Sequence, residues 1–105
     1  GNSYTAKGHV KDFMSEKMAL TDVDYIAWSD LDSTLHLTDS MLEAMHKRAV
    51  ASRLVKGRVG YQPRTAKLNM ISLKYAVKKD TLMATFYLDD KFAGIVGVKA
   101  NPATK

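Results

Sequence analysis

The chain has 105 residues, of which 46% are hydrophobic and 26% are charged, and its net charge at pH 7 is +5. This composition is ordinary for a globular protein, and we expect a single domain over residues 1–105 with loose ends at 1–4 and 100–105. The chain has no cysteine, which excludes disulfides, thiol catalysis and cysteine metal sites. No apolar run approaches the ~20 residues of a membrane-spanning helix.

The first predicted element is an amphipathic helix over residues 5–19. Its apolar residues recur at helical spacing, and they are Val10, Phe13, Met14 and Met18. A strand is predicted over residues 25–37, because apolar and polar residues alternate through its second half. A bulge near Ser29 would bring the two halves of this strand into one phase.

A second helix is predicted over residues 38–56, where apolar residues again recur at helical spacing. Thr38 or Asp39 can cap its first turn, and Ser40 with an acidic residue three positions later offers a capping-box alternative. Gly57 is expected to end this helix, because glycine readily adopts the left-handed conformation of a C-terminal stop. The next ten residues form a predicted loop that is long enough to take part in binding.

Three further strands are predicted over residues 68–78, 81–88 and 92–99. The middle strand carries apolar residues on both faces, which indicates a central position. The connections are too short for a parallel crossover, so the strands must pair as an antiparallel meander. Gly94 and Gly97 in the last strand indicate a bulge or a close approach of another segment.

These elements predict an α+β fold with the order α-β-α-β-β-β. About four antiparallel strands would form the sheet, and both helices would pack on one of its faces in a two-layer arrangement.

Charge is distributed unevenly along the chain. Residues 1–46 carry three lysines against eight acidic residues, a net charge of −5, while residues 47–105 carry thirteen Lys and Arg against three acidic residues, a net charge of +10. Because the two parts fold together, we expect a surface with one acidic and one basic side.

The strongest candidate site is a basic zone in the second helix and the loop that follows it. Its members are Lys47, Arg48, Arg53, Lys56, Arg58, Tyr61, Arg64 and Lys67. Such a zone can bind an acidic protein, an anionic polymer or a nucleic acid, although specific nucleic-acid binding usually adds aromatic platforms or a known motif. The alternative interpretation is a solvated surface without a binding role.

No other pattern indicates a reaction or a metal. The aspartates at 22, 24, 30 and 32 lack the spacing of an EF-hand loop, and the three histidines lack metal-ligand spacing. We therefore expect no cofactor, no metal and no enzymatic activity.

Several runs carry a resemblance to a known group of proteins. They are LDSTLHLTDS at residues 31–40, Met45 in the following helix, KDTL at 79–82 and TFYLD at 85–89. The chain resembles small exported proteins, often lipoproteins, of gut-dwelling Gram-negative anaerobes. The resemblance implies a periplasmic or envelope location, a cystatin-like fold and no catalytic residues. A first residue other than Met fits an upstream segment in the natural chain, with a removed signal peptide as one candidate.

Three functions remain open at this stage. The leading hypothesis is a non-enzymatic interaction domain of the cell envelope, which binds a protein or polymer through the open sheet face or the loop at residues 58–67. The first alternative is a cytoplasmic module that binds nucleic acid or another polyanion. The second is a carrier of a small ligand, held between the sheet and the helices.

Overall fold

The computed structural model describes residues 1–102. Its elements are α1 (Asn2–Glu16), β1 (Asp24–Trp28), β2 (Asp32–Thr34), α2 (Asp39–Ala51), β3 (Leu68–Val77), β4 (Asp80–Leu88) and β5 (Ile95–Ala100). The fold is α+β, as predicted. The looseness expected at both ends stays a prediction. In the structure α1 begins at Asn2, and after β5 the amide of Asn101 donates to the carbonyl of Met83. The expectation for residues 103–105 lies outside the described residues.

The sheet is antiparallel with the strand order β1-β3-β4-β5, and β2 also pairs with β3. The single strand predicted over residues 25–37 is therefore divided in two. β1 pairs with one end of β3 and β2 pairs with the other end. The sheet therefore contains five strands, but β1 and β2 share one edge position. The irregularity in β1 lies at Ile26, whereas Ser29 stays against β3 because its amide donates to the carbonyl of Ser72.

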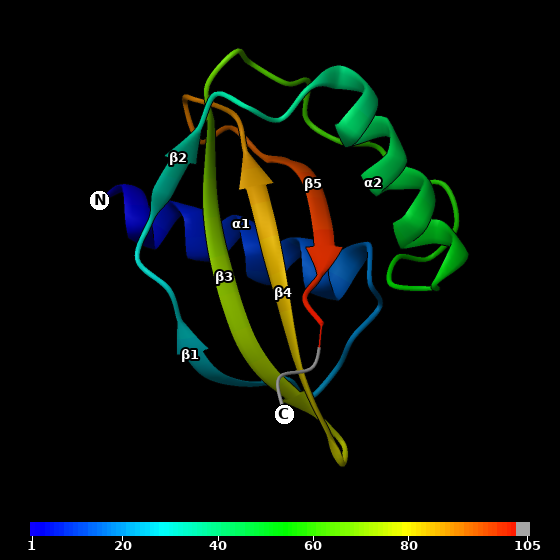
Figure 1. Cartoon of the computed structure of the whole chain (residues 1–105). Helices are drawn as coiled ribbons and strands as arrows, with labels where there is room; N and C mark the ends of the chain where they lie inside the picture. The colour runs from blue at the N-terminus through cyan, green and yellow to red at the C-terminus, as the bar shows by residue number, and fades with distance from the viewer. Residues whose placement is uncertain (103–105) are drawn as a thin grey trace.

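One face of the sheet is covered by α1, which runs behind the strands in Figure 1. Val10 and Met14 of α1 are fully buried against Leu73 and Phe86 of the two central strands. The alternation along the meander predicted this apolar face correctly, because side chains at every second strand position point the same way. This core joins α1 to the central strands of the sheet.

The second helix lies beside the edge strand β5 (Figure 1). Leu42 and Met45 of α2 pack against Tyr87 and Val96 on the face opposite α1, while Ala49 reaches the core under α1. The predicted arrangement of both helices on one face thus describes α1 fully and α2 only in part. A helix beside an edge strand also shields that edge from other chains.

Both ends of α2 have well-defined caps. Thr38 accepts a hydrogen bond from the amide of Met41 at 3.1 Å, as predicted for an N-cap. The predicted C-terminus at Gly57 is wrong, because the helix ends at Ala51 with Ser52 as its cap. The early stop follows from Arg53, which adopts a left-handed φ of 61°.

The last strand also begins later than predicted, at Ile95 instead of Phe92. The buried carboxylate of Asp89 accepts hydrogen bonds from the amides of Ala93 and Gly94, at 2.7 and 2.9 Å. These bonds satisfy the backbone without a strand partner and hold residues 89–94 as a compact connection. A bulge then follows at Val96, between the pairs that Tyr87 and Leu88 make with β5.

Candidate binding surface

The strand order places acidic and basic residues at opposite edges of the sheet. Asp24 and Asp32 are exposed on β1 and β2, at one edge, and Asp22 and Asp30 are exposed in the connections beside them. β5 forms the other edge, next to α2. The unequal charge of the two parts of the sequence therefore becomes a partial separation of charge across the folded domain, because Lys7 and Lys11 of α1 lie over the rings of Trp28 and Tyr25 in β1.

The basic edge is formed by exposed cations of α2, the segment after it and β5. We call this the basic surface, and its members are Lys47, Arg48, Arg53, Lys56, Arg58 and Lys99. Five of the six were predicted. Lys99 was missed because it belongs to a strand far along the chain, and only the strand order brings it beside α2. Its ammonium lies 6.0 Å from the centre of the Tyr87 ring.

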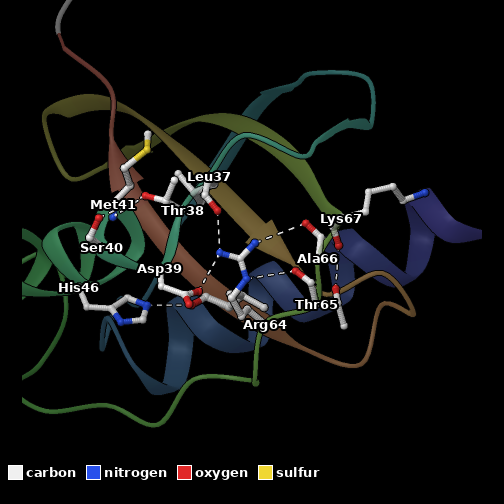
Figure 2. A network of polar contacts seen from close by, with 11 residues as sticks. Leu37, Thr38, Asp39, Ser40, Met41, His46, Arg64, Thr65, Ala66 and Lys67 are labelled. Atoms are coloured by element: carbon white, nitrogen blue, oxygen red, sulfur yellow. Dashed lines mark hydrogen bonds and ion pairs between the residues drawn. The ribbon is translucent and has the colours of Figure 1, made fainter.

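Arg64 does not belong to this surface. Its Nη1 donates to the carbonyl of Leu37 at 2.6 Å and pairs with the carboxylate of Asp39 at 3.2 Å, as Figure 2 shows. Its other nitrogens donate to the carbonyls of Thr65 and Ala66. These contacts occupy the guanidinium and hold the predicted binding loop against the start of α2.

Tyr61 is partly buried, and its ring packs against its neighbours. It stacks on His46 with 3.9 Å between ring centres, and Phe13 lies 5.9 Å away on the core side. Burial raises the pKa of its hydroxyl above the ordinary value of 10.0. Within the described part of the chain this buried hydroxyl has no hydrogen-bond partner.

Lys67 is exposed but lies in another part of the molecule. It lines an open hollow of about 400 Å³ together with Asn2, Asp32 and Asp90. Two carboxylates share this hollow, so it has no net basic character. Of the eight predicted residues, Tyr61, Arg64 and Lys67 are therefore removed from the candidate surface, and the other five remain.

Arg53 stands at a position where glycine is usual. The amide of Leu54 donates to the carbonyl of Ala49, and that of Arg53 donates to the carbonyl of Val50. This pair of bonds is the Schellman motif, and its left-handed residue is commonly glycine because a Cβ crowds the backbone there. The chain thus keeps a charged side chain at some cost in stability, as it also does at Lys78, whose φ is 56°.

A groove opens between α2 and β5 within the basic surface. Met45, Ala49, Leu54 and Val98 contribute apolar groups to it, and its volume is about 170 Å³. Arg48 lines it from the helix and Lys99 from the strand. Over residues 1–102, neither cation forms an ion pair with an acidic side chain.

The histidines have structural roles where their contacts are defined. The Nε2 atom of His9 lies 2.8 Å from the carbonyl of Phe92, and that of His46 lies 2.8 Å from the carbonyl of Val96. Within residues 1–102, no group of three or more His, Cys, Asp or Glu side chains is placed to hold a metal ion. Likewise, none of the helices in this range is long and apolar enough to cross a membrane.

Comparison of the chain with protein-family models, with curated proteins and with solved structures gave no match. The resemblance to small exported proteins and the cystatin-like fold both stay predictions. The function must therefore be argued from the basic surface and its groove.

Proposed function

We propose that the protein is a non-enzymatic interaction domain that binds an acidic protein partner through the basic surface. The observation that carries this proposal is that Arg48 and Lys99 flank one groove between α2 and β5 without an acidic partner in residues 1–102, with further exposed cations on α2 and in the segment after it. A charge-separated domain of this kind attracts and orients an acidic partner before contact.

An acidic protein fits this surface better than a nucleic acid does. Proteins that bind single strands usually stack bases on exposed aromatic rings. Tyr61 was the one aromatic residue of the predicted zone, and its partly buried ring is already stacked on His46, with Phe13 nearby. A nucleic acid or other polyanion remains the alternative ligand, to be distinguished by experiment.

A small-ligand carrier receives less support. The interface between α1 and the sheet is filled by side chains such as Met14, Leu73 and Phe86, which are fully buried. The groove between α2 and β5 is smaller than the 300–1,000 Å³ that is usual for ligand sites. The hollow of about 400 Å³ beside Lys67 is large enough, but it is open and lined mainly by polar residues, unlike the mostly apolar sites that hold small ligands.

The resemblance to exported proteins supports an envelope location for this interaction. Fractionation of cells that carry the native gene, followed by immunoblotting, tests the location directly. Recovery of the protein with the envelope is expected, and recovery with the cytoplasm would contradict this part of the proposal.

The binding proposal is tested with polyglutamate as a defined acidic polypeptide and a short single-stranded oligonucleotide as the competing polyanion. Fluorescence anisotropy of each probe is followed with the native chain and with the triple variant Arg48→Glu, Arg53→Glu, Lys99→Glu. A control variant reverses the same amount of charge at three exposed lysines elsewhere, Lys78→Glu, Lys79→Glu and Lys91→Glu.

We expect polyglutamate binding that weakens with salt and is lost in the surface variant but retained in the control variant. Equal loss in both variants would show that net charge alone attracts the probe, and would overturn the proposal. Tighter binding of the oligonucleotide than of polyglutamate would favour the nucleic-acid alternative instead.

A further inference from the structure

The groove between α2 and β5 exists because the two elements are close at one end and separate at the other. At Gly97 the helix is very near: a Cβ there would lie 2.9 Å from Cδ1 of Leu42 and 3.2 Å from Sδ of Met45. Past this contact α2 and β5 diverge (Figure 1), and the groove lies between the last turn of α2 and residues 98–100.

The groove has room for one apolar side chain. An apolar cavity of about 150 Å³ can hold a benzene molecule, and this groove offers about 170 Å³. Its walls include Ala49 and Val98, which are almost completely buried, and Leu54, which is partly buried. Ala49 and Val98 are already covered by other atoms, so an occupant would gain dispersion contacts mainly from Leu54 and from Ala100, which is exposed.

The mouth of the groove carries positive charge on both sides. Arg48 lies on the helix and Lys99 on the strand, and both side chains are exposed. Glu43 of α2 pairs with Lys47. Within the described range it forms no ion pair with Arg48. An occupant with carboxylates on either side of an apolar group would match both cations and the apolar walls.

We propose that the groove is the anchor pocket for one aliphatic or aromatic side chain within an acidic segment of the protein partner. This inference rests on the proposed function and adds to it the chemistry of the partner segment. Protein interfaces commonly depend on a few apolar anchors that are buried in pockets, while surrounding charges orient the approach. The basic surface would therefore supply orientation, and the groove would supply selectivity for the sequence of the partner.

The test uses three short capped peptides of equal length. One has a leucine between glutamates, the second has serine in place of that leucine, and the third has lysines in place of the glutamates. Binding is measured by fluorescence anisotropy, and the site is located from the NMR shift of the Met45 methyl group. We expect the leucine peptide to bind about tenfold tighter than the serine peptide and the lysine peptide not to bind.

A pair of variants links this preference to the groove. Ser52 lines the groove, so Ser52→Phe would fill it, whereas Ala51 is an exposed neighbour that does not line it. We expect Ser52→Phe to abolish the difference between the leucine and serine peptides, and Ala51→Phe to leave it unchanged. Circular dichroism confirms that both variants are folded.

The outcomes separate this inference from the proposed function. Equal binding of the leucine and serine peptides, with none for the lysine peptide, would leave the basic surface in place and overturn the anchor pocket. No binding of either acidic peptide would overturn both. A preference for leucine that survives Ser52→Phe would place the apolar contact elsewhere, and would also overturn the anchor pocket.

A second copy of the chain is the competing occupant. Ile26 is 45% exposed on the acidic edge, between Asp24 and Asp30, and so has the same combination of apolar and acidic groups. Sedimentation velocity measures self-association of the native chain and of Ile26→Ser. We expect a monomer in both cases. Salt-sensitive association that is lost in Ile26→Ser would assign the groove to a second copy and overturn a separate partner.

Discussion

Arg64 and Leu37 are 27 positions apart in the chain, and the guanidinium of one donates to the backbone carbonyl of the other at 2.6 Å. The contact joins the segment before β3 to the segment that enters α2. Asp39, in the first turn of α2, adds its carboxylate at 3.2 Å. One side chain thus ties the long connection between α2 and β3 to the short segment between β2 and α2.

Replacement of Arg64 by alanine should destabilise the fold by about 2 kcal/mol, because hydrogen bonds from a charged donor to partly buried acceptors contribute about 1.5–3 kcal/mol. Arg64→Lys should recover little of this loss, since a compact ammonium cannot reach acceptors on both sides as a planar guanidinium does. Urea denaturation measures both changes. Arg58→Ala, at an exposed arginine, is the matched control and should change stability by less than about 0.5 kcal/mol. Equal effects at Arg64 and Arg58 would contradict a structural role for Arg64.

The fold was largely predictable from the sequence, because the alternation of residues in the meander and the spacing of residues in the helices encode which face is buried. The ends of elements were less predictable. The C-terminus of α2 was missed because its left-handed residue is Arg53, where a glycine would have marked the stop. The late start of β5 was missed because the buried carboxylate of Asp89 satisfies backbone amides that a strand would otherwise pair.

The candidate surface was predictable only in part. The charge on α2 is visible in the sequence, but the partners of a side chain depend on segments that meet only in the fold. Arg64 and Lys67 looked equivalent to Arg48, yet one is engaged by Leu37 and the other shares a hollow with two carboxylates. The addition of Lys99 required the strand order.

Arg53→Gly should stabilise the protein by about 1 kcal/mol, because a residue with a Cβ is strained at a left-handed φ and glycine is not. The same variant should weaken polyglutamate binding, since it removes one cation of the basic surface. Arg48→Gly provides the contrast. This residue lies inside α2, so glycine there should destabilise the protein by about 1 kcal/mol. Thermal unfolding distinguishes the two signs, and destabilisation by Arg53→Gly would show that the arginine side chain contributes to folding.

Gly97→Val should destabilise the protein by about 2 kcal/mol, because the added side chain would enter the contact between β5 and α2. The nearest atoms belong to Leu42 and Met45, which are buried and can shift only by disturbing their own packing. Gly60→Val is the control, since nothing lies within 4 Å of a Cβ at that position. It should change stability by less than about 0.5 kcal/mol in urea denaturation. A tolerant Gly97 would mean that α2 can move away from β5 at little cost.

Tyr61→Phe should stabilise the protein at neutral pH by about 1 kcal/mol, because its buried hydroxyl has no partner in the described part of the chain and the aromatic stack on His46 is kept. The native protein should also lose stability in alkali. Burial raises the pKa of Tyr61 in the folded state above 10.0, so the unfolded chain ionises first, and the free energy of unfolding falls as the pH rises above about 10.

The same variant should reduce this alkaline loss without removing it, since burial also raises the pKa of Tyr75. Urea denaturation at neutral pH and above about pH 10 tests both statements on one pair of proteins. If Tyr61→Phe lowers stability at neutral pH, the hydroxyl must have a water partner that supports the stack. If the free energy of unfolding falls equally steeply with pH in the two proteins, Tyr61 ionises as readily in the folded state as in the unfolded chain. Its hydroxyl would then be more open to solvent than the contacts of its ring with His46 and Phe13 imply.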